Sequence, residues 1–193
     1  MRVGLTGGIG AGKTAVARLF EEFGAYVIDT DLLAREAAAP NSDGFLAITR
    51  AWPDVVRHGV LDRAALAEII FKDPAARERL NAILHPHVRR LAFEREARAG
   101  PGQLVVHVVP LLFETQYDEL MDKSVLVTAP QAVRIERIVS RDHLDEARVR
   151  ARMAAQIAPD RARGRADYVI ENDSDVEDLR RRTRSVYNKL VFE

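Results

Sequence analysis

Residues 7–14 have the sequence Gly7-Gly8-Ile9-Gly10-Ala11-Gly12-Lys13-Thr14, which matches the pattern G-x-x-x-x-G-K-[ST] at every fixed position. The apolar run at 3–6 predicts a short buried strand, and residues 15–20 predict a helix. Strand, glycine-rich loop and helix in this order are the setting in which the pattern cradles phosphates. A plain glycine turn between a strand and a helix is the alternative. The flanking strand and helix favour a nucleoside triphosphate site.

The residue types of this loop suit phosphate chemistry. Glycines allow the backbone to curl until several N–H groups point inward at phosphate oxygens, and the helix N-terminus adds partial positive charge there. We expect Lys13 to reach the β- and γ-phosphates and the Thr14 hydroxyl to ligate Mg²⁺. The predicted nucleotide-binding residues of this stretch are Gly8, Gly10, Ala11, Gly12, Lys13, Thr14 and Ala15.

The composition narrows the class of protein. The 193 residues suit one domain, or one core with insertions, and 47% of them are apolar. Lys plus Arg equals Asp plus Glu at 29 each, whereas a dedicated nucleic-acid binder usually has a basic excess. The absence of cysteine excludes disulfides and thiolate metal sites. The sequence has neither a signal peptide nor an apolar stretch of about 18 residues, so we expect a cytoplasmic protein without a membrane partner.

Short apolar runs separated by helical stretches organise the chain. Five such runs predict strands: 3–6, 25–28, 104–109, 124–128 and 168–170. Strands alternating with helices predict an α/β fold of the P-loop NTPase type, with a doubly wound parallel sheet covered on both faces. Residues 43–100 contain no convincing strand. The gap from 32 to 100 is too long for a simple crossover, so we expect a helical insertion at the carboxyl ends of the strands, where ligands bind.

Helical patterns fill the intervening segments. Residues 62–71 and 73–91 predict two helices of the insertion, and Pro86 can bend the second. Phe45 and Trp52 are expected to pack in the insertion. A second helix-rich stretch, dense in arginine, covers residues 130–165, and an amphipathic helix at about 176–190 closes the chain.

Two aspartates follow the second predicted strand. Asp29 and Asp31 are two residues apart on an extended segment, so both can face the phosphate loop. One of them could accept the proton of an attacking hydroxyl, as a kinase aspartate does. The alternative for Asp31 is structural, because it precedes Leu32 and would cap the next helix.

Other polar groups have weaker signals. The segment 110–114 (Pro-Leu-Leu-Phe-Glu) follows the central strand, where a substrate would lie, but a helix start with a solvated Glu114 explains it equally well. Arg134, Arg137 and Arg141 share one helical face and could meet a transferring phosphoryl group from a mobile flap. Interleaved acidic residues make a solvated, salt-bridged surface the alternative. His107, in mid-strand, is most simply a buried, hydrogen-bonded histidine.

Taken together, the motifs resemble the dephospho-coenzyme A kinase family, in order and over nearly the whole chain. The resemblance rests on the segments 5–14 (LTGGIGAGKT), 27–31 (VIDTD), 61–63 (LDR), 84–86 (LHP), 109–114 (VPLLFE), 141–142 (RD), Gln156 and 166–172 (ADYVIEN). The phosphate loop alone is shared by many NTPases, whereas this combination is far more specific. Thr30 stands where alanine is common, and residues 51–59 depart from the usual glycine-containing turn.

The resemblance implies an activity and a three-part organisation. ATP would phosphorylate the ribose 3′-hydroxyl of dephospho-coenzyme A, the last step of coenzyme A synthesis. A nucleotide-binding core would comprise 1–31, 101–133 and 166–193, with a helical substrate domain at 32–100 and a lid at 134–165. The partner is thus a small molecule, and we expect a monomer or weak homo-oligomer.

The family's roles fall on particular residues of this chain. Asp31 would be the general base, Arg141 the lid arginine, and Asn172 would lie near the adenine of ATP. His85, Leu111 and Glu114, which lie in matching segments, would contact the acceptor.

Two other functions remain open at this point. A nucleoside or nucleoside-monophosphate kinase would share the core and differ in the insertion. A guanine-nucleotide switch would usually carry Asn-Lys-x-Asp, but the Asn188-Lys189 pair here lacks the Asp and lies in the terminal helix.

Overall fold

A computed structural model describes residues 1–192 and divides the chain into two compact units. The first comprises residues 1–28 and the chain from Ala99 onward, and the second comprises Asp29–Arg98. The elements of the first unit are β1 (Arg2–Gly7), α1 (Lys13–Glu22), β2 (Tyr26–Asp29, ending at the boundary), β5 (Val105–Val108), η2 (Tyr117–Leu120), β6 (Lys123–Thr128), α6 (Gln131–Asp142), α7 (Glu146–Ala154), α8 (Pro159–Arg165), β7 (Tyr168–Glu171) and α9 (Val176–Phe192). Those of the second are α2 (Thr30–Ala37), α3 (Asp43–Ala51), η1 (Pro53–Val55), β3 (Val56–Arg57), β4 (Val60–Leu61), α4 (Arg63–Lys72) and α5 (Pro74–Glu96).

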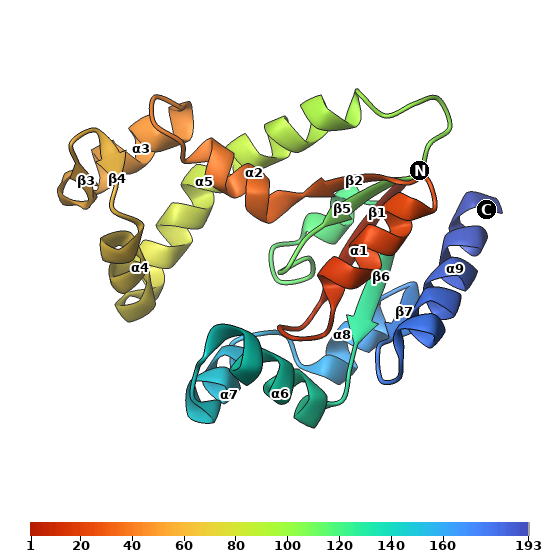
Figure 1. Cartoon of the computed structure of the whole chain (residues 1–193). Coiled ribbons are helices and arrows are strands. Elements are labelled where there is room, and N and C mark those ends of the chain that lie inside the picture. Colours follow the sequence, from red (N-terminus) through yellow and green to blue (C-terminus); the bar gives the residue numbers. More distant parts are fainter. Residues whose placement is uncertain (193) are drawn as a thin grey trace. The chain divides into compact units, whose positions relative to one another are not determined.

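The sheet of the first unit has the strand order β2-β5-β1-β6-β7 (Figure 1). β1 pairs in parallel with β5 and β6, and β6 pairs in parallel with β7. The predicted α/β fold with a doubly wound parallel sheet is therefore confirmed. Because β1 is central, the loop that follows it opens at the middle of the carboxyl edge, where parallel sheets bind ligands.

Alternation along β6 shows how both faces of this sheet are covered. Val125 and Val127 belong to one apolar cluster, which α1 and α9 complete through Phe20 and Leu190. Leu126, between them, belongs to a second cluster on the opposite face, because successive strand residues point to opposite sides. That second cluster contains residues of the segment after β5, of η2 and of α8: Leu112, Phe113, Tyr117 and Ala162.

His107 is fully buried in β5. Its Nδ1 lies 3.1 Å from the Tyr117 hydroxyl, so the prediction of a buried, hydrogen-bonded histidine is confirmed.

The second unit is mainly helical and has a core of its own. Phe45, Ile48, Leu66 and Leu80 are buried in it, and Trp52 packs against them, as predicted. The statement that residues 43–100 contain no strand is wrong, because β3 and β4 form a small antiparallel pair. Each has only two residues, too few for an alternating pattern to be recognised.

α5 continues through Pro86 as one helix of 23 residues. Proline removes one backbone hydrogen bond and crowds the preceding turn, which bends a helix. In Figure 1 the yellow first half and the green second half of α5 run in different directions. Within residues 1–192, no helix is both long enough and apolar enough to cross a membrane.

Candidate active site

The phosphate loop joins β1 to α1 and leaves the helix N-terminus open. Gly12 precedes the helix in a left-handed conformation (φ 97°), and no side chain within residues 1–192 caps it. A Cβ atom at Gly12 would lie 2.1 Å from the Asn172 Nδ2 atom. Glycine is therefore required at this position both by its left-handed backbone conformation and by the close approach of the Asn172 side chain. The uncapped N–H groups of the first turn are available to an anion.

Lys13 and Thr14 lie at the start of α1. The Lys13 Nζ atom donates to the Gly7 carbonyl oxygen at 2.7 Å, so its ammonium group lies back across the loop. Within the loop, the Ala11 N–H donates to the Gly8 carbonyl oxygen at 3.0 Å. Thr14 and Ala15 are exposed in the first helical turn, where the Thr14 hydroxyl is accessible to a ligand.

Side chains from distant parts of the chain hold the loop. Asn172, buried just after β7, donates from Nδ2 to the Ala11 carbonyl oxygen at 2.8 Å. The Ile9 carbonyl oxygen accepts from Arg134 Nε at 2.9 Å, and the Ile9 N–H donates to Gln156 Oε1 at 2.8 Å. Both peptide groups that flank residue 9 are therefore hydrogen-bonded to the segment between β6 and β7.

Arg134 places a buried positive charge beside this loop. Only 9% of the residue is exposed, and burial lowers the pKa of its guanidinium, which still remains charged at neutral pH. Its Nη2 atom would lie 2.3 Å from a Cβ atom at Gly8. No carboxylate among residues 1–192 pairs with it, so its charge can act on an anion in the loop. Arg137, one turn further, has Nη1 3.5 Å from the Gly10 carbonyl oxygen.

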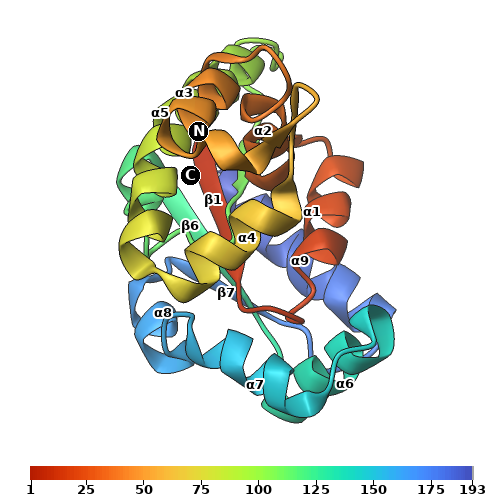
Figure 2. The same cartoon turned by 90° about the vertical axis from the view of Figure 1, so that its left-hand side faces the viewer.

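Arg141 lies on the same helix but is bound elsewhere. Its Nε donates to Asp142 Oδ1 at 2.7 Å and its Nη2 to Oδ2 at 2.9 Å. This hydrogen-bonded pair raises the pKa of Arg141 and lowers that of Asp142. Two-thirds of the Arg141 side chain is exposed. Figure 2 shows α6, which carries it, grouped with α7 and α8 at one end of the first unit. The catalytic role of Arg141 stays a prediction.

The segment after β5 lines a cavity beside the loop. The cavity has a volume of about 420 Å³, and its walls include Gly8, Ala11, Pro110, Phe113, Gln156 and Ile157. Glu114, another lining residue, accepts the Ile157 N–H at 2.9 Å through Oε1 and so ties the two walls together. Leu111 is 40% exposed, beside the buried Leu112. Mostly apolar walls next to a phosphate loop suit a nucleoside.

The two aspartates at the junction of β2 and α2 have different surroundings. Asp29 Oδ1 accepts the N–H groups of Asp31 and Leu32 at 2.9 and 3.3 Å, which makes Asp29 the N-cap of α2. The alternative that Asp31 caps this helix is therefore wrong, because the helix begins at Thr30, earlier than that reading required. Asp31 lies exposed in the first turn, where the helix dipole stabilises a carboxylate.

His85 belongs to α5 of the second unit and is half-buried. Burial, and to a smaller extent the nearby Arg89 guanidinium, lowers its pKa. A neutral imidazole can both donate and accept a hydrogen bond, which suits contact with a hydroxyl or an amide.

Comparison with known proteins gives one consistent family. Residues 1–178 match the family model described as dephospho-CoA kinase. The dephospho-CoA kinase of Streptomyces avermitilis is 43% identical over 193 residues, which cover 99% of this chain and 94% of that one. The dephospho-CoA kinase of Moorella thermoacetica is also 43% identical over 193 residues, covering 97% and 91%. The chain belongs to the dephospho-CoA kinase family. Members are kinases that transfer a phosphoryl group to an alcohol, so this chain is an enzyme of that class.

Solved structures agree on the fold. TT1252 from Thermus thermophilus has a TM-score of 0.87 and 38% identity, covering 98% of this chain and 97% of its own. Dephospho-CoA kinase from Campylobacter jejuni has a TM-score of 0.73 at 23% identity, covering 99% and 97%. A shikimate kinase from Acinetobacter baumannii, solved with shikimate, has a TM-score of 0.55 at 18% identity, covering 99% and 93%. Dephospho-CoA kinases thus share the fold of other small-molecule kinases with a phosphate loop.

Within this family frame, three residues beside the loop had no individual prediction. Arg134 and Arg137 appeared only as members of an arginine face, and Gln156 only inside a matching segment. The three-residue spacing of the arginines shows that they share a face, but no sequence signal shows that this face turns to the loop. Conversely, the salt-bridged surface expected as an alternative is present for Arg141, which pairs with Asp142, and for Arg148, which pairs with Asp145.

Proposed function

We propose that this kinase transfers the γ-phosphoryl group of ATP to the ribose 3′-hydroxyl of dephospho-coenzyme A, giving coenzyme A and ADP. The observation that carries the proposal is the ordered phosphate loop with an open helix N-terminus, in a chain of this family. The same reaction is the last step of coenzyme A synthesis.

The donor side uses the loop and its neighbours. Backbone N–H groups of the loop and the first turn of α1 bind the phosphates, and Lys13 exchanges its hydrogen bond with Gly7 for one with a β- or γ-phosphate oxygen. Arg134 adds a buried positive charge next to Gly8. The adenine of ATP lies on the side of Asn172, whose backbone carbonyl oxygen is 3.5 Å from Arg137 Nη2.

Mg²⁺ fits the residues at the start of α1. In residues 1–192 no group of three or more His, Asp or Glu side chains is arranged to hold a metal. A Mg²⁺ ion bound to a nucleotide keeps several waters and takes few protein ligands. The Thr14 hydroxyl is the proposed protein ligand. When bound, the ion neutralises phosphate charge and orients the γ-phosphate.

Asp31 is the proposed general base. Its carboxylate accepts the proton of the 3′-hydroxyl while that oxygen attacks the γ-phosphorus, and the bond from this phosphorus to the bridging oxygen breaks as ADP leaves. His85, Leu111 and Glu114 are proposed to contact the acceptor.

The two remaining parts of the chain are assigned a lid role and an acceptor-binding role. We assign residues 134–165 to a lid and 32–100 to the domain that carries the acceptor. Closing a lid over bound ATP keeps water from the γ-phosphate, so transfer to the acceptor exceeds hydrolysis. In the closed state the Arg141 guanidinium leaves the Asp142 carboxylate and stabilises the negative charge on the transferring phosphoryl group.

The test is a coupled ADP-release assay with Mg²⁺ and ATP, with and without dephospho-coenzyme A, followed by mass analysis of the product. Acceptor-dependent ADP release and a product heavier by one phosphoryl group are expected. ADP release that no acceptor changes would contradict the substrate assignment. A panel of nucleosides and nucleoside monophosphates would then test the alternative small-molecule kinases.

A further inference from the structure

The second unit contains an apolar groove that no role above uses. It has a volume of about 180 Å³ and lies among α2, α3, α4 and α5. Its apolar lining comes from all four helices, with the accessible side chains Ala34, Ala67, Ile70 and Leu84 beside core residues such as Ile48, which is buried. Pockets that enclose a whole drug-sized ligand usually have roughly 300–1,000 Å³. This groove is therefore suited to one arm of a ligand rather than to a complete nucleotide.

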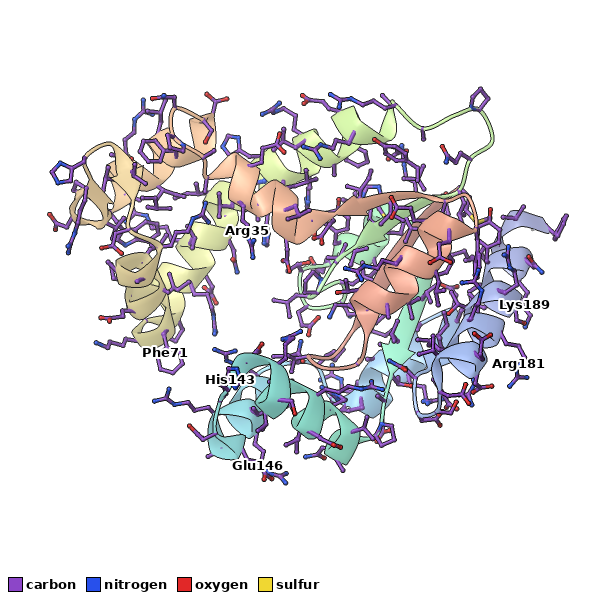
Figure 3. All side chains as sticks on the ribbon, in the orientation of Figure 1. Arg35, Phe71, His143, Glu146, Arg181 and Lys189 are labelled. Carbon is purple, nitrogen blue, oxygen red and sulfur yellow. The ribbon has the colours of Figure 1, made fainter. Side chains whose placement is uncertain are left out.

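Two arginines supply all the charge in the lining of this groove. Arg35, from α2, and Arg63, the first residue of α4, both line it, and no acidic residue does. The Arg63 Nη2 atom donates to the Arg35 backbone carbonyl oxygen at 3.3 Å, which brings the two residues together. Figure 3 labels Arg35 on α2. The groove thus combines an apolar channel with two guanidinium groups.

These two guanidinium groups have no carboxylate partner among the described residues. Three other arginines of the same unit do: Arg57 pairs with Asp62 at 3.3 Å, Arg90 with Glu94 at 2.6 Å, and Arg95 with Glu36. What sets Arg35 and Arg63 apart is that both also line the groove. Arg63 also stands at a helix N-terminus, the end where a cation opposes the helix dipole. The position of Arg63 therefore does not stabilise its helix, and a bound anion would remove the unfavourable interaction.

We propose that this groove binds the pantetheine arm of the acceptor, with the adjoining diphosphate on Arg35 and Arg63. The inference rests on the proposed function, in which dephospho-coenzyme A is the acceptor. In that molecule a diphosphate of two negative charges joins the adenosine to an arm whose second carbon carries two methyl groups. Two guanidinium groups match the diphosphate, because arginine forms forked hydrogen bonds with phosphate oxygens. The apolar lining matches the dimethyl group and the methylene groups of the arm, whereas its hydroxyl and amides need the open side of the groove, where they stay hydrated.

The first experiment measures KM for each substrate in Arg35→Ala and Arg63→Ala. Each variant is expected to raise KM for dephospho-coenzyme A about ten- to hundredfold, from the loss of charge-assisted hydrogen bonds, and to change KM for ATP less than about twofold. Arg77→Ala is the matched control, because Arg77 is exposed on α5 and does not line the groove. An equal rise in KM for ATP, or none for the acceptor, would overturn the proposal.

The second experiment uses 4′-phosphopantetheine, which contains the arm and one phosphate but no adenosine. Calorimetric titration should show that it binds to the wild-type protein and that Ala67→Glu weakens binding at least about tenfold. Ala67 lies on the rim of the groove, exposed on α4, so a carboxylate there opposes the ligand's phosphate without entering the core. Ala75→Glu adds the same charge to an exposed position on α5 outside the groove and should leave binding unchanged.

The two experiments separate the groove from the reaction. Failure of the wild-type protein to bind 4′-phosphopantetheine at millimolar concentration, or binding that Ala67→Glu does not change, would overturn the groove assignment. Failure of the wild-type protein to make coenzyme A would overturn the proposed function, and the titration would still report whether the groove binds the arm. Thermal unfolding of each variant confirms that it is folded before its KM is measured.

Discussion

The phosphate loop and the groove of the second unit are built in different ways. Asn172, Arg134 and Gln156 hold the loop from 161, 125 and 147 positions away in the sequence. The helices around the groove start instead at local caps, in which Ser42, Asp62 and Asp73 accept N–H groups two or three residues ahead. The loop is thus held by contacts from distant parts of the chain, whereas the groove presents two arginines without a carboxylate partner among the described residues.

This difference predicts two kinds of mutational response. Changes at the loop should affect ATP binding and the chemical step, because every hydrogen bond there supports the site of phosphoryl transfer. Changes at the groove should affect only the KM of the acceptor. Variants at Lys13, Asp31 and Asn172 test the first kind of response, and a variant at His85 tests the stability of the second unit.

The largest effect is expected for Lys13→Ala. Removal of the ammonium group leaves the β- and γ-phosphates without their single lysine contact in the transition state, so transfer should fall below detection in the coupled assay. Lys189→Ala is the control, because Lys189 lies exposed on α9, where Figure 3 labels it. Transfer at a measurable fraction of the wild-type rate would show that Lys13 is not needed for the chemistry.

Asp31→Asn should lower kcat by roughly 10²- to 10⁴-fold, the usual contribution of a general base, while ATP binding survives. Asp29→Asn is a matched control, because asparagine caps a helix about as well as aspartate and the cap of α2 would be kept. Steady-state kinetics with both substrates make the comparison. If Asp29→Asn lowers kcat and Asp31→Asn does not, the two assignments must be exchanged.

The loop and the sheet could be predicted from the sequence because both depend on local patterns. The motif at 7–14 specifies strand, loop and helix, and buried parallel strands appear as short apolar runs. The strands β3 and β4 were not predicted because two residues are too few to show an alternating apolar pattern. The capping role of Asp29 was not predicted because Asp29, Thr30 and Asp31 are all residue types that cap helices well. Only the backbone dihedral angles show which of them does so.

The contacts around the loop depend on packing that no local pattern encodes. Arg134 and Arg141 share a helical face, but seven residues separate them by about 10 Å along the axis, at about 1.5 Å per residue. Only the nearer arginine therefore reaches the Ile9 carbonyl oxygen. That approach also requires glycine at position 10, where an added Cβ atom would lie 2.7 Å from the Arg134 carbonyl oxygen.

Asn172→Ala tests whether the distant hydrogen bonds of the loop matter for ATP. The substitution leaves the Ala11 carbonyl oxygen without its 2.8 Å partner and opens a small space in a buried position. A loss of about 1–3 kcal/mol is expected, seen as roughly 5- to 150-fold weaker ATP binding in a calorimetric titration, with the KM of the acceptor nearly unchanged. Asn188→Ala, at an exposed site on α9, is the control. Unchanged ATP binding would show that the loop keeps its shape without this contact.

The smallest effect concerns the pH dependence of stability at His85. Because burial lowers the pKa of His85, the unfolded chain binds a proton here at a pH where the folded chain does not. Stability contributed by this group is therefore complete above about pH 6.5, the ordinary histidine value, and decreases as the pH falls from there toward the folded pKa. His85→Gln should reduce the decrease in melting temperature between pH 7.5 and pH 5, at about constant ionic strength, while the same change at exposed His58 should not. An equal decrease in His85→Gln and wild-type protein would show that the imidazole is as well solvated in the folded chain as in the unfolded one.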